Sequence, residues 1–213
     1  MFIYNILGLP AQTMKEIQIF KSVLHNVERD KIIRIFEWGS GLSTIHYSNY
    51  LLKSNVPFEW HSIDNDRVWH QKVKTLVEKK NLESCIWLYL KEFKPFWEKH
   101  GWGHIPPPCG IFGPKSENEH AYINFPKQLS NKFDIVIIDA RFRRHCIQTA
   151  KEVLLPEGVA ILHDAHKDHY HMDLEDFKYQ DFYESGSWYP FQKEKNKIWL
   201  GSMENRTIIK KLK

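Results

Sequence analysis

The stretch that decides the fold of this chain is IIRIFEWGSGLST, residues 32–44. Its first five residues are mostly apolar or β-branched, and they predict a buried parallel strand. Two glycines, Gly39 and Gly41, follow, and Ser43 and Thr44 then open a helix with apolar periodicity. Glycines at a strand-to-helix turn let the backbone approach a ligand closely, and the helix N-terminus offers unpaired N–H groups. We therefore expect a nucleotide-like cofactor at this turn.

Strand and helix patterns alternate along most of the chain, which predicts an α/β fold with a doubly wound, mostly parallel sheet and helices on both faces. A capping box, Thr13 to Glu16, opens an N-terminal helix over 13–27. Further helices are expected at about 43–53, 67–80, 121–129 and 143–154, and strands at 32–36, 58–63, 86–90 and 133–139, with a turn and a fifth strand within 154–165. Residues 177–185 and 197–202 predict a C-terminal antiparallel strand pair. We expect a single domain over residues 1–213.

The composition is that of an ordinary globular protein, with 42% hydrophobic and 26% charged residues among 213. No apolar run reaches the length of a membrane span, and the N-terminus lacks the features of a signal peptide. Three cysteines without metal-binding spacing suit a reducing compartment, so we expect a cytoplasmic protein. A net charge of +4 permits an acidic substrate or RNA but argues for neither.

Residues 93–120 interrupt the alternation with five prolines and no steady period. So long an irregular stretch in a compact domain predicts a lid-like insertion, with a surface excursion as the alternative. Trp97 and Trp102 lie in it and are candidates for a pocket wall. Core positions are expected for Trp60, Trp87 and Trp199, which lie in strand-like runs.

Acidic residues follow several of the predicted strands. Asp64 ends the second strand, where a carboxylate can accept hydrogen bonds from ribose hydroxyls. Asp139 ends the fourth strand, and His163 and Asp164 end the fifth. Because ligands bind beyond the carboxyl ends of strands in open α/β sheets, these side chains should face one crevice.

These features resemble the Rossmann-like (class I) S-adenosylmethionine-dependent methyltransferases over about residues 13–202. EWGSGLST is similar to their variant glycine loop, and SIDNDRVW, VIIDARFR and AILHDA are similar to blocks of small-molecule O-methyltransferases, including some that methylate sugars. An NAD-dependent dehydrogenase fits less well, because Thr44 stands where its fingerprint requires a third glycine.

The resemblance implies roles for the residues of the glycine turn and the second strand end. Glu37 would lie near the methionine amino group, the turn would pass under methionine and ribose, and Asp64 would bind the ribose hydroxyls. Helix capping is the alternative role for Ser43 and Thr44. The predicted cofactor set is Glu37, Gly39, Ser40, Gly41, Ser43, Thr44, Asp64 and Asn65.

Two routes would activate a hydroxyl acceptor at the fourth and fifth strand ends. In the first, His163 or His166 is the general base and Asp139 orients it. In the second, Asp139 and Asp164 hold Mg²⁺ or Mn²⁺, as the resemblance to metal-dependent O-methyltransferases implies. Substrate contact is a further prediction, for which Arg141 and Arg144 of the RFRR run are the candidates, with helix-surface charges as the alternative.

The leading functional hypothesis is methyl transfer to a hydroxyl of a small molecule, a sugar being one option. A nucleic-acid (RNA) methyltransferase is the first alternative; against it, the Asp/Asn-Pro-Pro-Tyr motif of adenine N6 enzymes is absent after the fourth strand, where IDARF stands. The second alternative is a non-catalytic S-adenosylmethionine-binding protein, and retention of four strand-end carboxylates argues against it. The sequence is also compatible with a homo-oligomer.

Overall fold

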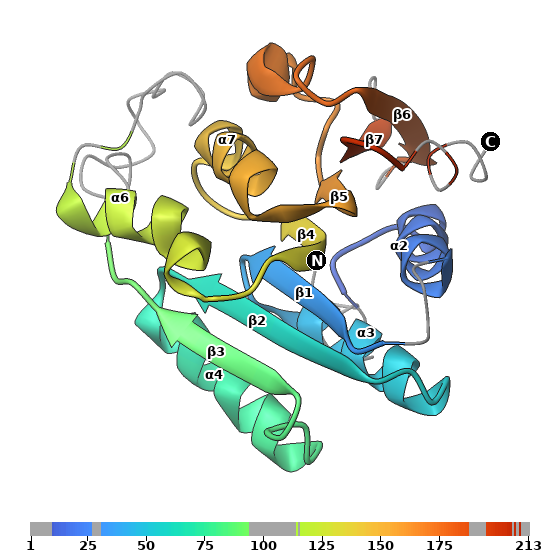
Figure 1. Ribbon diagram of the computed structural model, residues 1–213. Helices are drawn as coiled ribbons and strands as arrows, with labels where there is room; N and C mark the ends of the chain where they lie inside the picture. Colours follow the sequence, from blue (N-terminus) through green and yellow to red (C-terminus); the bar gives the residue numbers. More distant parts are fainter. Residues whose placement is uncertain are drawn as a thin grey trace.

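The computed structural model describes residues 10–26, 31–93, 114, 116–187, 195–205, 207 and 209. In this part of the chain seven strands form one sheet in the order β3-β2-β1-β4-β5-β7-β6. β7 runs antiparallel to β5 and β6, and the pairs from β3 to β5 are parallel, which confirms the predicted sheet (Figure 1). The strands are β1 (Ile33–Trp38), β2 (Phe58–Asp64), β3 (Ile86–Leu90), β4 (Phe133–Ile138), β5 (Leu154–Leu162), β6 (Tyr179–Gly186) and β7 (Asn196–Ser202).

Helices cover both faces of the sheet, as the alternating pattern predicted (Figure 1). One face carries α2 (Met14–Asn26), α3 (Leu42–Lys53) and α4 (Arg67–Lys79). The other carries α6 (Glu117–Asn124), the 3₁₀ helix η1 (Phe125–Gln128) and α7 (Arg143–Val153), followed by η2 (Asp168–Asp173). No helix in the described ranges is long and apolar enough to cross a membrane.

Two apolar cores lie on opposite faces of the central strands, because successive side chains of a strand point to opposite sides. On β4, Ile135 and Ile137 pack into the core beneath α2, α3 and α4, whereas Val136 and Ile138 pack into the core beneath α6 and α7. All four side chains are buried. With both faces covered, the carboxyl ends of the strands are left to form a site.

Three expectations need correction. Helix α6 begins at Glu117, four residues earlier than predicted, because Ser116 and Glu119 form a capping box. Strand β5 begins at Leu154, where a turn was expected, and its pairing with β4 contains a register shift. Trp87 is 38% exposed, since it lies on the edge strand β3, and so it is not a core residue.

Trp60 and Trp199 are fully buried, as predicted. Residues 94–113, which include Trp97 and Trp102, lie outside the described residues. The lid-like insertion therefore stays a prediction, as does the single-domain boundary at 1–213.

The glycine turn after β1 joins three strand ends. Gly39 donates its N–H to the Ile63 carbonyl at 2.9 Å, and Asp139 donates its N–H to the Trp38 carbonyl at 3.1 Å. Gly39 has a φ of +97°, and a Cβ there would lie 2.5 Å from the Asp139 carbonyl oxygen. Only glycine accommodates both the positive φ and the close approach of the Asp139 carbonyl. Gly39 therefore allows the end of β1 to pack directly against the ends of β2 and β4.

We predict that Gly39→Ala destabilises the protein by about 3 kcal/mol, because it adds backbone strain and a steric clash. Gly186→Ala is the matched control, since Gly186 has a φ of +91° but nothing within 4 Å of its Cβ position. The control should cost only about 1 kcal/mol, from backbone strain alone. Urea unfolding measures both, and equal losses would contradict the role given to the Gly39 contact.

Candidate active site

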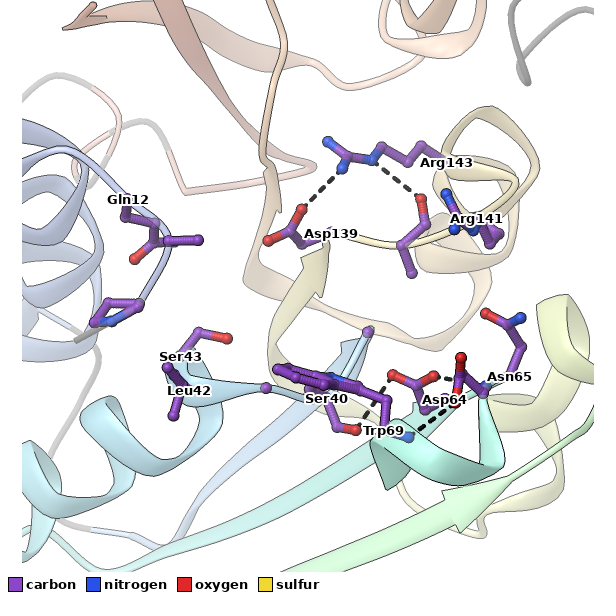
Figure 2. A pocket seen from close by; sticks show the side chains of 16 residues that line it. Gln12, Ser40, Leu42, Ser43, Asp64, Asn65, Trp69, Asp139, Arg141 and Arg143 are labelled. Carbon is purple, nitrogen blue, oxygen red and sulfur yellow. Dashed lines mark hydrogen bonds and ion pairs between the residues drawn. The ribbon is translucent and has the colours of Figure 1, made fainter. Parts of the chain in front are cut away.

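A cavity of about 440 Å³ opens at the carboxyl ends of β1, β2 and β4 (Figure 2). This is the edge where open α/β sheets bind their ligands. The predicted site residues that line it are Gly39, Ser40, Gly41, Ser43, Asp64, Asn65, Asp139 and Arg141. The sequence interpretation missed other lining residues as site members, namely Pro10, Ala11, Gln12, Leu42, Asp66, Trp69, Ala140 and Arg143.

Asp64 presents a desolvated carboxylate to the cavity from the end of β2. Its side chain accepts hydrogen bonds from the Asp66 N–H at 2.9 Å and the Ser40 hydroxyl at 3.3 Å. The residue is 7% exposed. Burial raises the pKa of this carboxyl, and the hydrogen bonds oppose that rise. A carboxylate offers about four acceptor positions, so Asp64 can still accept a hydrogen bond from a ligand's hydroxyl.

Gly41 contrasts with Gly39, because the protein itself does not require glycine there. Its backbone is extended, with φ −174°. A Cβ at Gly41 would meet Ser43 Oγ at 3.7 Å and a Trp69 ring carbon at 3.9 Å, which are ordinary contacts. The space that a side chain would fill belongs to the cavity lining, so the absent side chain gives a ligand access to the backbone.

Trp69 forms part of the cavity wall beside the turn (Figure 2). Its indole N–H donates to the Ser40 carbonyl at 2.7 Å, and its backbone N–H is capped by Asp66 at 2.8 Å. Asp66 caps the first turn of α4. This places the Trp69 indole against the glycine turn. The capping residue Asp66 can be recognised in the sequence, but no local pattern predicts that the Trp69 indole contacts the Ser40 carbonyl.

Glu37 and Thr44 lie beneath the glycine turn rather than in the cavity lining. The Glu37 carboxylate is 1% exposed and accepts hydrogen bonds from Thr44 at 2.6 Å and from Ser43, Trp60 and Ser62 at 3.0 Å each. Thr44 also accepts the Gly41 N–H at 2.9 Å. The structure therefore corrects the prediction that these two side chains face the ligand. They support the turn from below.

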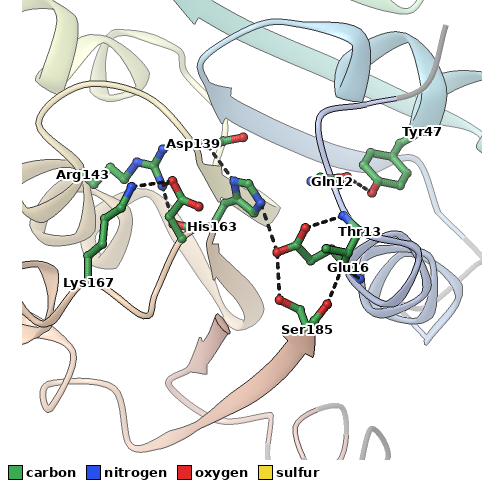
Figure 3. A network of polar contacts seen from close by, with 10 residues as sticks. Gln12, Thr13, Glu16, Tyr47, Asp139, Arg143, His163, Lys167 and Ser185 are labelled. Atoms are coloured by element: carbon green, nitrogen blue, oxygen red, sulfur yellow. Dashed lines mark hydrogen bonds and ion pairs between the residues drawn. The ribbon is translucent and has the colours of Figure 1, made fainter. Parts of the chain in front are cut away.

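On the other side of the cavity, Asp139 is held by two cations (Figure 3). Its Oδ1 accepts from Arg143 Nη2 at 2.9 Å and from His163 Nδ1 at 3.0 Å. Burial alone would raise the pKa of the Asp139 carboxyl, but the positive charges of His163 and Arg143 lower it below its usual value. Asp139 is therefore an ionised hydrogen-bond acceptor.

Arg143 also contacts Asp164, with Nη1 3.3 Å from Oδ2. Its guanidinium thus bridges the two carboxylates that the sequence offered as ligands for Mg²⁺ or Mn²⁺. A cation already between them neutralises both charges, and no group of three or more metal-ligating side chains occurs among the described residues. As arranged here, Asp139 and Asp164 bind Arg143 and do not offer a metal ion an open set of ligands, so these residues do not fit the metal hypothesis.

His163 lies between two carboxylates, with Nδ1 3.0 Å from Asp139 and Nε2 3.5 Å from Glu16 Oε1 (Figure 3). Burial lowers the pKa of this imidazole, but Asp139 and Glu16 outweigh burial and raise it to about 10. An imidazole that already carries both protons cannot accept another. His163 is therefore an imidazolium rather than the predicted general base.

The structure does not bring His166 or Arg144 to the cavity. His166 is half-buried in the segment between β5 and η2 and does not line the cavity. Arg144 donates from Nε to Asp173 at 3.0 Å, which ties α7 to η2. Of the arginines in RFRR, Arg141 and Arg143 line the cavity, whereas Arg144 pairs with Asp173 outside it.

Comparison with known proteins identifies solved structures that share this fold. No family model matches the sequence, and no curated protein matches it. The O-methyltransferase TomG from Streptomyces achromogenes, solved with S-adenosylmethionine, gives a TM-score of 0.57 at 12% identity over 95% of this chain and 86% of that one. An S-adenosylmethionine-dependent O-methyltransferase from Thermotoga maritima gives 0.57 at 11% identity, over 97% and 72% of the two chains. A protein named as an rRNA methylase from Clostridium thermocellum gives 0.54 at 11% identity, over 92% and 99%.

The fold is that of the Rossmann-like S-adenosylmethionine-dependent methyltransferases. The strand order and the reversed β7 observed here are part of that methyltransferase fold. At identities of 11–12% the likeness concerns the fold, so the role of each side chain rests on its own contacts.

The buried Glu37 beneath the methyltransferase-type glycine turn gives the protein a pH-dependent stability. Burial raises the pKa of Glu37 from 4.5 to about 7, and the four hydrogen bonds only partly oppose it. The folded state therefore holds an extra proton between these values, and the free energy of unfolding falls as pH rises through this range. The fall is at most about 3 kcal/mol.

We predict that Glu37→Gln removes this fall. Urea unfolding at pH 5 and pH 8 should show wild type losing stability relative to the variant as the pH rises. Glu78→Gln, at an exposed position on α4, is the control and should follow wild type at both pH values. A stability difference between wild type and Glu37→Gln that is the same at pH 5 and pH 8 would refute a protonated Glu37.

Proposed function

We propose that this protein is an S-adenosylmethionine-dependent methyltransferase that acts on a hydroxyl group of a small molecule. The observation that carries the proposal is the arrangement of the cavity. Three residues line the same cavity. Gly41 is a glycine that the fold itself does not require, Asp64 is a desolvated carboxylate, and Asp139 is an ionised one. One side thus suits an adenosyl group, and the other suits a polar acceptor.

The residues present fit S-adenosylmethionine. Asp64 would accept hydrogen bonds from the ribose hydroxyls, and the backbone of Gly39–Gly41 would contact the neighbouring part of the molecule. Trp69 and Asn65 form the adjoining wall. When bound, the cofactor supplies a methyl group on a sulfonium, which is electrophilic without help from a metal.

Asp139 is the residue that would orient the acceptor. Its Oδ1 is occupied by Arg143 and His163, and Oδ2 has no hydrogen-bond partner among the described residues. An acceptor hydroxyl that donates to Asp139 would turn an oxygen lone pair toward the donor side of the cavity. That hydroxyl becomes strongly acidic once its oxygen begins to form a third bond, so a carboxylate of low pKa suffices to take the proton.

The charges around the cavity favour a small molecule over RNA. Its wall contains three carboxylates, Asp64, Asp66 and Asp139, beside two arginines, Arg141 and Arg143. Arg143 is already paired with Asp139 and Asp164. RNA binding depends on unpaired cations that neutralise phosphates, and a mixed wall does not provide them. Two of the three solved structures named above are O-methyltransferases, which supports a hydroxyl acceptor.

Cofactor binding can be tested without the acceptor. Calorimetry with S-adenosylhomocysteine should show binding to wild type, and Asp64→Asn should weaken it about tenfold to a hundredfold, because hydrogen bonds to a charged group are lost. Asp173→Asn, which breaks the pair with Arg144 outside the cavity, should leave the affinity unchanged. No binding to wild type at millimolar ligand would refute the cofactor assignment.

The acceptor class can be tested with methyl-labelled S-adenosylmethionine and a panel of phenols, sugars and RNA. We expect transfer to a small-molecule hydroxyl, and a loss of at least about a hundredfold in Asp139→Asn. The same variant should bind S-adenosylhomocysteine within twofold of wild type. Transfer confined to RNA, or full activity in Asp139→Asn, would contradict the proposal.

A further inference from the structure

Glu16 is a buried carboxylate that lies outside the cavity and that helix capping explains only in part. Its Oε2 accepts the Thr13 N–H at 2.6 Å and so completes the capping box of α2. Its Oε1 accepts the Ser185 hydroxyl at 2.8 Å and lies 3.5 Å from His163 Nε2. The side chain is fully buried. A capping residue needs no such burial, so Oε1 calls for a second explanation.

Oε1 of Glu16 belongs to a chain of charged side chains that reaches the cavity at Asp139 (Figure 3). The imidazolium of His163 bridges Glu16 on α2 and Asp139 at the end of β4. Beyond Asp139 the chain of charged side chains continues through Arg143 to Asp164, and Lys167 pairs with Asp164 at 2.9 Å. Three carboxylates thus face three cations, and without Glu16 the cluster has an excess positive charge.

The segment before Glu16 forms part of the cavity wall. Residues 10–12 line it, and the Gln12 side chain accepts a hydrogen bond from the Tyr47 hydroxyl. The Thr13 hydroxyl donates to the Ser185 carbonyl on β6. Glu16 is therefore fixed by its own helix cap and by Ser185 on β6, so its carboxylate has little freedom to leave His163.

We propose that Glu16 is a positioning residue of the methyl-transfer centre: its carboxylate pairs with the Nε2 edge of His163 and thereby keeps the Nδ1 proton of the same ring on Asp139. This inference rests on the proposed function, since it assigns Asp139 to the acceptor side. The physical reason is that a buried imidazolium without a second carboxylate beside it is costly. Without Glu16, His163 would lose a ring proton or turn, and Asp139 would lose one of the two donors that fix it.

The inhibitor sinefungin gives a readout that needs no acceptor. It carries an amine where S-adenosylmethionine carries the transferable methyl, whereas S-adenosylhomocysteine carries nothing there. The ratio of the two affinities therefore reports a carboxylate that faces the methyl position. Asp139→Asn removes the carboxylate altogether, so the affinity ratio of this variant shows how far the preference for sinefungin can fall. The protonation of His163 is read separately, by ¹⁵N NMR of histidine-labelled protein.

The decisive variant is Glu16→Gln, which keeps the shape and the cap but removes the charge. We expect His163 in this variant to lose a ring proton at pH 8, at which wild type keeps both. We also expect the sinefungin preference to fall about tenfold while S-adenosylhomocysteine binds within twofold of wild type. Ser185→Ala removes the other partner of the same oxygen but keeps the Thr13 hydrogen bond to the residue 185 carbonyl and the charge of Glu16, so it should change neither readout.

Glu16→Asp provides a second variant, because it keeps the charge but withdraws it from His163 by one methylene. It should reduce the His163 ring protonation and the sinefungin preference less than Glu16→Gln does. This variant also tests the inference if Glu16→Gln does not fold. Wild-type behaviour of both readouts in either folded variant would overturn the inference. If wild type binds neither ligand, the proposed function fails, and the His163 signal still decides whether Glu16 holds the ring.

Discussion

The ionised Asp139 carboxylate, placed between Arg143 and His163, is the interaction on which the rest of the candidate site depends. Each partner comes from a different element, Arg143 from the first turn of α7 and His163 from the end of β5. A buried charge that loses one partner is strongly destabilising, so the cluster fixes the relative positions of these elements. It also places the Arg143 guanidinium between Asp139 and Asp164 and leaves Asp139 Oδ2 without a partner among the described residues.

The buried carboxylate of Glu37 has the opposite character. It is surrounded by four neutral donors rather than by cations, and burial raises its pKa to about 7. Glu37 holds the glycine turn from below, whereas Asp139 lines the cavity. The two carboxylates lie at neighbouring strand ends, and their different surroundings shift their pKa values in opposite directions.

Most of the fold and half of the site could be predicted from the sequence. Parallel strands bring their carboxyl ends to one edge, so Gly39, Asp64 and Asp139 were expected to meet, and all three line the cavity. Which arginine of RFRR enters the cavity was not readable, because the phase of α7 is set by the left-handed conformation of Phe142 just before it. Glu16 satisfied a local capping rule, which hid its contact with His163, 147 residues further along the chain.

The most direct test of this account is a crystal structure of the protein with S-adenosylhomocysteine, grown in the presence of Mg²⁺. The account predicts the ribose hydroxyls on Asp64, the sulfur facing the side of the cavity that holds Asp139, and Arg143 still bridging Asp139 and Asp164. Ligand bound elsewhere on the chain would contradict the cofactor site. A magnesium ion held by Asp139 and Asp164, with Arg143 displaced, would contradict the charge cluster.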